Sequence, residues 1–396
     1  MNSKVLVKNK LTLVILARNS LRIPLNSYFW QLNMRIKHLF LVISILLCQT
    51  FGNVFAQHSK GQAIEGKAVG YDSGYVISFR DNFIVTLVNE TKTNTMQSSF
   101  RTKTNDYSLN YKTNKINTWG IGIDYKWLTF EFTSQMPWYT PNPQYGSVQN
   151  AGFGFGITGR RLAFRNFYEF SKGYYLENTD NWLKDYTTLN NRYYTRPDIE
   201  TFTYYANVNY IFNNRHFSNN ASLWQLERQN TKAGTLVGGL SYIFNSFYAD
   251  SSIIPTTGID SFPRSNNTYF GLNCFGINLG YMGTLPFGKK KKWFLTTAII
   301  PGISRQWGEI IVENLGVKQT GKLLGFQSEF RFGFGYNGDN WYIGSVFKSY
   351  SNLNVVDGEE PFSISNSFGR FYIGYRFNPP KIKNEKVNKF MKMIKL

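Results

Sequence analysis

The chain has 396 residues, a net charge of +20 and an aromatic content of 17%. Seven Lys or Arg and no acid lie in 1–56, and six Lys with one Glu lie in 378–396, so only about +8 belongs to the rest. Because the positive charge is concentrated at the two ends, it is not the basic surface of a nucleic-acid-binding protein, and no nucleic-acid partner is expected.

The N-terminal part carries the pattern of an export signal. Residues 34–37 are basic, 39–47 are apolar, and Val54-Phe55-Ala56 is a small-residue cleavage pattern. This is typical of a secretory signal peptide and too short for a membrane helix. We expect a signal peptide at 34–56 that is cleaved after Ala56. Residues 1–33 are then an extended leader or the product of a misplaced start codon, and 57–74 are a periplasmic N-terminal segment.

The body, 75–377, is made of segments that alternate in character with a period of two. Residues 324–336 read LGFQSEFRFGFGY, in which leucine and aromatic residues share one face and small or charged residues share the other. Similar segments occur at 119–132, 153–170, 202–212 and 275–281. Strands that are apolar outside and polar inside are what a barrel in lipid requires. The pattern predicts an all-β, transmembrane, antiparallel up-and-down β-barrel of about 12 strands, with 10 and 14 open.

The connections between these segments set the strand count. Long ones are expected at 136–150, 176–198, 249–267, 306–320 and 351–363, and short ones near 126, 159, 288 and 338. Counting back from the last strand places 249–267 on the outer side, whereas counting forward from 126 places it on the periplasmic side. One strand between 213 and 267 is therefore missed or overcounted.

The last expected strand, 371–377, ends at Phe377. An aromatic strand ending in Phe resembles the signal that the outer-membrane insertion machinery recognises. The 19 residues of 378–396 depart from that pattern and are read as a basic periplasmic tail. A weak amphipathic helix that binds membrane phosphates is the alternative for the tail.

The alternation assigns two sets of candidate residues. Polar residues on the inner face should line the lumen, either in a hydrogen-bonded plug or along a pore or ligand pocket. Tryptophans near strand ends should form girdles at the lipid headgroups. The lumen candidates are Asp124, Glu131, Asn207, Asn209, Asn278, Gln327, Glu329, Arg331, Arg370 and Arg376, and the girdle candidates are Trp127, Trp138, Trp293 and Trp341.

Several ordered motifs also carry a family resemblance. They are YKWLTFEF at 125–132, TGRRLAFRNFYEFSKGYYLEN at 158–178, RPDIETFTYYANVNYIFNNRHFS at 196–218 and ADSSIIP at 249–255. Together they resemble a family of uncharacterised Gram-negative outer-membrane proteins that is catalogued as a domain of unknown function. The resemblance implies export and a barrel, and it implies no catalytic or binding residue.

No catalytic, metal or cofactor site is expected. After cleavage the histidines and cysteines of the chain are His58, His216 and Cys274, and their spacings are unrelated to those of zinc or iron sites. His216 lies in a turn-like segment without a nucleophile elbow. The function expected is a non-enzymatic outer-membrane barrel, acting as a passive channel or as a structural or binding component. A barrel-embedded lipid-modifying enzyme and a soluble periplasmic lipocalin-like carrier remain alternatives. The partners expected are outer-membrane lipid and the insertion machinery, and the oligomeric state is undetermined.

Overall fold

The computed structural model describes residues 65–101, 106–136, 138–255, 267–312, 316–354 and 362–378. The expected signal peptide with Ala56, the leader 1–33 and the tail beyond residue 378 lie outside these ranges. So do residues 57–64 of the expected periplasmic segment 57–74.

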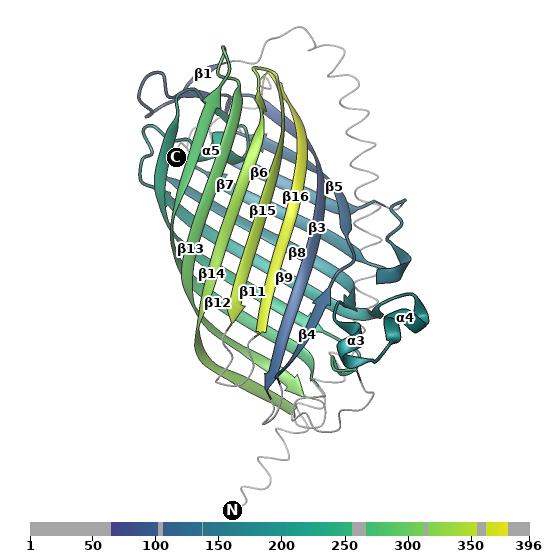
Figure 1. Ribbon diagram of the computed structural model, residues 1–396. Coiled ribbons are helices and arrows are strands. Elements are labelled where there is room, and N and C mark those ends of the chain that lie inside the picture. Colours follow the sequence, from purple (N-terminus) through teal and green to yellow (C-terminus); the bar gives the residue numbers. More distant parts are fainter. Residues whose placement is uncertain are drawn as a thin grey trace, which may run out of the picture. The chain divides into compact units, whose positions relative to one another are not determined.

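Twelve antiparallel strands form a closed barrel, as the sequence predicts (Figure 1). Each strand pairs with its neighbour along the wall, and β16 closes the ring on β3 with Phe377 opposite Phe83. The strands are β3 (Phe83–Arg101), β5 (Ile116–Tyr125), β6 (Leu128–Gln135), β7 (Gln149–Thr158), β8 (Leu162–Leu176), β9 (Tyr194–Ile211), β11 (Ala233–Tyr248), β12 (Asn267–Phe287), β13 (Trp293–Val312), β14 (Gly316–Asn337), β15 (Trp341–Asn354) and β16 (Phe362–Phe377).

The two ends of the barrel are connected differently. At the end where β16 stops, short turns join β5 to β6, β7 to β8, β12 to β13 and β14 to β15, and we call it the turn end. The opposite end, the loop end, carries η1 (Pro143–Tyr145), α3 (Thr179–Trp182) and α4 (Tyr186–Asn190). Near the loop end, β4 (Asp106–Lys112) pairs with both β3 and β8, so it replaces β5, β6 and β7 in the wall. Ten strands close the ring at that level, and a barrel narrows as its strand number falls.

The structure resolves the conflict in the strand count. The sequence reading missed β11 and the long connection 212–232 that precedes it at the turn end. With both included, 249–267 lies at the loop end from either direction of counting. The expectation of a long connection at 306–320 is wrong, because β13 runs to Val312 and β14 begins at Gly316. The two strands therefore extend into most of this stretch.

The outer face of the wall is apolar and the inner face is polar. On β14, Phe326 and Leu324 are 62% and 73% exposed, whereas the next residue, Gln327, is 3% exposed. Ile277 and Leu279 on β12 are likewise exposed on the outside. This is the arrangement of a barrel in lipid and the reverse of a soluble carrier with an apolar interior. In the described part of the chain, no helix has the length and apolar character to cross a bilayer.

Residues 65–82 and 212–232 fill the lumen at the turn end, and we call them the turn-end plug. They contribute a small sheet of β1 (Gly66–Lys67), β2 (Val76–Ser78) and β10 (Glu227–Gln229), with α5 (Asn219–Leu223) beside it. Ser218 begins α5 as its N-cap, accepting a hydrogen bond from the amide of Ala221 at 2.9 Å. Phe79 and Leu226 are fully buried. The barrel wall therefore begins at Phe83, and residues 75–82 belong to the plug instead of the wall.

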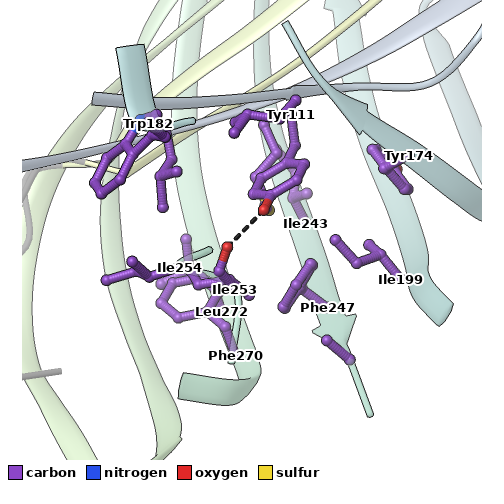
Figure 2. Packing of buried hydrophobic residues seen from close by; sticks show 14 of the residues in the cluster. Tyr111, Tyr174, Trp182, Ile199, Ile243, Phe247, Ile253, Ile254, Phe270 and Leu272 are labelled. Atoms are coloured by element: carbon purple, nitrogen blue, oxygen red, sulfur yellow. Dashed lines mark hydrogen bonds between the residues drawn. The ribbon is translucent and has the colours of Figure 1, made fainter. Parts of the chain in front are cut away.

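At the loop end the lumen is filled by an apolar cluster (Figure 2). Ile253 and Ile254, from the segment after β11, enter the barrel and are 6% and 3% exposed. Figure 2 shows the hydroxyl of Tyr111 donating a hydrogen bond to the carbonyl of Ile253 at 2.5 Å. Trp182 of α3 and Phe270 of β12 pack in the same cluster. We call the segment 249–255 with this cluster the loop-end plug.

Candidate functional site: a charged chamber between the plugs

A cavity of about 150 Å³ lies in the lumen between the two plugs. Its walls come from β3, β6, β7, β8, β9, β11, β14, β15 and β16, and Leu223 and Trp224 of the turn-end plug complete it. In a protein interior, a cavity of this volume holds a molecule about the size of benzene or several waters. We call this cavity the chamber.

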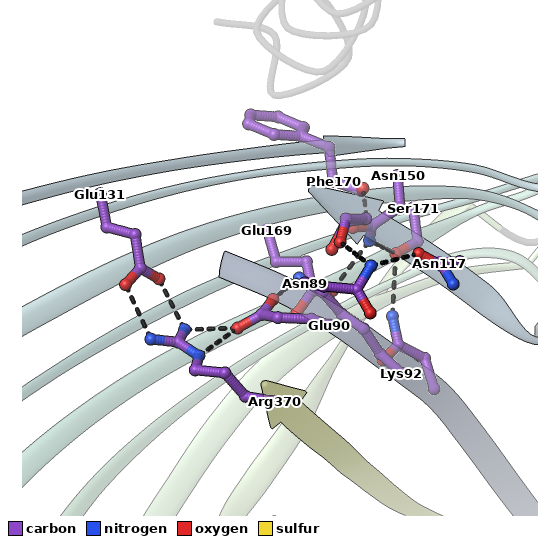
Figure 3. Close-up of polar contacts among 12 residues, drawn as sticks. Asn89, Glu90, Lys92, Asn117, Glu131, Asn150, Glu169, Phe170, Ser171 and Arg370 are labelled. Atoms are coloured by element: carbon purple, nitrogen blue, oxygen red, sulfur yellow. Dashed lines mark hydrogen bonds and ion pairs between the residues drawn. The ribbon is translucent and has the colours of Figure 1, made fainter. Parts of the chain in front are cut away.

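One part of the chamber wall is a network centred on Arg370 of β16 (Figure 3). Its guanidinium donates to Glu131 at 2.6 and 2.7 Å and to Glu90 at 2.7 Å. Lys92 lies 3.0 Å from Glu90 and 3.5 Å from Glu169. Two cations thus face three carboxylates here, and each carboxylate has an ionic partner. We call these five residues the acidic group, because they carry one net negative charge.

The network continues into neutral side chains that fix its geometry. Asn150 donates to Glu169 and to the hydroxyl of Ser171, both at 2.8 Å. Asn94 donates to the same Ser171 hydroxyl at 2.8 Å. These bonds link β3, β7 and β8, so each charged side chain is held in one position by a partner on another strand.

The other part of the wall is basic. Glu329 of β14 is ion-paired with Arg331 on its own strand and with Lys348 of β15 at 3.3 Å. Arg165 of β8 also lines the chamber and stacks on Trp224, its guanidinium carbon 3.4 Å from the ring centroid. No carboxylate of the described chain pairs with Arg165. Arg331 and Lys348 therefore share one carboxylate, and we call Arg165, Glu329, Arg331 and Lys348 the basic group.

All ten lumen candidates lie on the inner face of the wall. Nine of them are less than 9% exposed, and the side chain of Arg370 is 13% exposed. They do not form one site. Glu131, Asn207, Arg331 and Arg370 line the chamber, and Glu329 lies behind it.

The remaining lumen candidates lie elsewhere inside the barrel. Gln327 hydrogen-bonds Asn278 and Ser241 near Asn209, in a smaller polar pocket beside Glu329. Asp124 lies next to the acidic group, in a pocket shared with Glu131. Arg376 holds the turn-end plug and takes no part in the chamber.

Arg376 is fully buried at the turn end. It donates to the carbonyl of Gln225 at 2.5 Å and to the side chain of Asn337 at 2.6 Å, and it stacks 3.9 Å from the ring centroid of Phe79. Asn337 in turn donates to the side chain of Gln225 at 2.6 Å. The plug is therefore bonded to the ends of β14 and β16 through a buried guanidinium.

Ionic contacts at the turn between β14 and β15 reinforce this attachment. Arg228 of the plug lies 2.7 Å from Asp339, which also lies 2.6 Å from Lys292. Burial alone would raise the pKa of Asp339, but hydrogen bonds from Lys292 and Arg228 hold it at about 2. Deeper in the plug, burial and the carboxylate of Glu227 raise the pKa of Tyr71 well above its ordinary value.

The tryptophan candidates divide between the two ends. Trp293 and Trp341 begin strands at the turn end with 42% and 54% exposure, and Trp127 lies half-buried in the turn after β5. Trp341 lies against Tyr375, with ring centroids 4.5 Å apart. Trp138 is 75% exposed in the connection after β6, at the loop end.

The histidine and cysteine that the sequence analysis weighed have structural partners. His216 lies at the plug surface, with its ring nitrogens 2.8 Å from Asp72 and 3.0 Å from Asn213. Cys274 is buried on the inner face of β12 and accepts a hydrogen bond from Asn352 at 3.1 Å. Within the described residues, no three His, Cys, Asp or Glu side chains come together as metal ligands.

Sequence reasoning missed six central residues of the chamber. Four of them, Glu90, Lys92, Arg165 and Glu169, lie two or four residues apart on inward faces of β3 and β8, so the alternation used elsewhere contained their signal. Lys348 has the same kind of signal on β15. Trp224 lies in the irregular connection 212–232, where no periodicity marks a residue as inward.

Solved structures are similar to this chain only at low identity and low TM-score. A search of solved structures finds the outer-membrane protease OmpT of Escherichia coli, at 12% identity and a TM-score of 0.36, covering 75% of this chain and 97% of that one. The toluene transporter TodX of Pseudomonas putida follows at 8% and 0.26, covering 75% and 90%. The translocator domain of the autotransporter NalP of Neisseria meningitidis matches at 12% and 0.29, covering 84% and 97%. At these values none of them passes an activity to this chain.

A search of the curated proteins finds no match. The family described as "Domain of unknown function (DUF4421)" matches residues 70–377. These residues include all twelve wall strands and most of the turn-end plug. The chain therefore belongs to the DUF4421 family.

Proposed function

We propose that this chain is an outer-membrane barrel that acts as a closed, non-enzymatic binding component and not as an open passive channel. The observation that carries the proposal is the turn-end plug, whose Arg376, Gln225 and Asn337 contacts fix it inside the wall. A second closure by Ile253 and Ile254 at the loop end supports it. The two plugs leave between them a small chamber lined by charged residues. Such a chamber favours binding of a small ligand over passage of solutes through the barrel.

Placement in the outer membrane is part of the proposal. The apolar outer face, the tryptophans at the turn end and the final strand ending at Phe377 support it. The partners that follow are outer-membrane lipid around the wall and the insertion machinery during biogenesis.

Conductance of the refolded protein in planar bilayers tests the proposal. Wild type should give no steady conductance steps. A variant in which residues 217–228 and 251–255 are both replaced by Gly-Ser linkers should give them, because the lumen then loses filling at both ends. A Gly-Ser linker in place of the exposed segment 184–191 at the loop end is the control and should stay closed. Steady steps from the wild type would overturn the proposal.

A further inference from the structure

The basic group of the chamber is poorly neutralised by the protein itself. Arg331 and Lys348 share one carboxylate, Glu329, and Arg165 makes no ion pair with any described residue. Uncompensated charge in a protein interior is costly, and buried cations are ordinarily paired. Of the acidic group, Glu131 lies near Arg165, but its two carboxylate oxygens are already bound by two nitrogens of Arg370.

Two of these cations also have unused hydrogen-bonding groups at the chamber. Arg331 is 5% exposed, and its buried Nη1 has no hydrogen-bond partner in the described structure. Its Nε is used by Glu329. The Arg165 guanidinium makes no hydrogen bond or ion pair with any described residue, and its contact is the face of Trp224. A buried, unpartnered donor that borders a cavity indicates a missing acceptor.

The rest of the lining indicates what the remainder of a ligand that supplies this acceptor would be like. Phe167, Phe368 and Trp224 border the chamber together with Leu223, Ile243, Val346 and Ile364. Aromatic and aliphatic walls with a few convergent polar groups are typical of small-molecule sites. An arginine beside such walls favours a planar oxyanion attached to an apolar body.

We propose that the chamber binds a small organic carboxylate, whose carboxylate is held by Arg165 and Arg331 and whose apolar part lies against Trp224. This inference rests on the proposed function, since it names the ligand class of the same closed barrel. The chamber volume of about 150 Å³ limits the ligand to roughly the size of a benzoate ion.

The test compares benzoate with benzamide, which has nearly the same shape and no charge. Each is present during refolding in detergent, so that binding does not depend on opening a plug. The readout is the unfolding midpoint as a function of ligand concentration, because a ligand of the native state raises stability in proportion to its affinity. We expect benzoate to bind at least tenfold more tightly than benzamide.

Two variants locate the effect. Arg165→Gln should weaken benzoate binding at least tenfold, and it removes no ion pair that holds the wall. Arg161→Gln, an exposed arginine four residues earlier in the turn before β8, removes the same charge and should leave binding unchanged. Equal binding of benzoate and benzamide, or full binding by the Arg165 variant, would overturn the proposal. Tighter binding of inorganic phosphate than of benzoate would also overturn it.

The outcomes separate this inference from the proposed function. If the wild-type protein stays closed in bilayers but does not bind benzoate, only the proposed ligand class is wrong. If it shows steady conductance, the proposal of a closed barrel is wrong, whether or not benzoate binds.

Discussion

At the turn end the lumen is filled by a segment that is hydrogen-bonded to the wall, whereas at the loop end it is filled by aliphatic and aromatic side chains. Arg376 makes bonds to Gln225 and Asn337 in the first case, and Ile253 and Ile254 pack on Tyr111 and Phe270 in the second. The difference follows from the width of the wall. Twelve strands leave room for a folded segment that must satisfy its own backbone groups, whereas ten strands leave a space that side chains can fill.

The two closures should therefore respond to different changes. A plug fixed by a few directional bonds is weakened strongly when one central donor is removed, because several acceptors lose their partner together. An apolar cluster loses stability gradually with the volume of side chain removed. Substitution of one residue at each end tests this contrast.

The largest effect is expected from Arg376→Met. The change leaves the carbonyls of Gly338 and Gln225 and the side chain of Asn337 without their donor in a buried site. A cost of about 3 kcal/mol or more follows from unsatisfied buried acceptors. Trypsin should then cleave within 212–232 in folded protein. Arg215→Met, which removes an exposed arginine of the same connection, should leave the rest of the connection as resistant to trypsin as in wild type. An Arg376 variant as resistant as wild type would show that the guanidinium does not hold the plug.

A smaller effect is expected from Ile253→Ala. Truncating a buried isoleucine costs about 2 kcal/mol or more, and here the loss is confined to a segment that also keeps its backbone bonds to Arg196. Hydrogen exchange of the amides in 249–255 should speed up while exchange in 217–229 stays unchanged. Leu189→Ala, at a side chain 79% exposed on α4, is the matched control. Faster exchange at both ends would mean that the plugs open together.

The same contrast explains what the sequence revealed and what it did not. Wall strands such as β14 carry a period of two along their length, so barrel class, strand number and the inward direction of Glu329 and Arg331 were all predictable. The turn-end plug has no repeating pattern, since its residues are held in place by partners far along the chain. Gln225, for example, meets Asn337 across 112 positions. Long-range polar pairing leaves no local trace, and for this reason neither the segment that fills the turn end nor Trp224 could be predicted from the sequence.

The smallest effect is expected from acid, through Asp339 at the turn end. Its pKa of about 2 lies below the ordinary 3.8, so its contribution to stability is fully present above pH 3.8 and is lost as the pH falls through about 2. Because the side chain is 40% exposed, the change should be modest. Hydrogen exchange of residues 225–229, corrected for intrinsic rates, should become faster between pH 4 and pH 2. Asp339→Asn should show faster exchange already at pH 5 and a weaker pH dependence, whereas Asp81→Asn, at an exposed carboxylate near the same end, should behave as wild type. Exchange of residues 225–229 that does not accelerate between pH 4 and pH 2, or an Asp339→Asn variant as pH-dependent as wild type, would contradict the assignment of this acid sensitivity to Asp339.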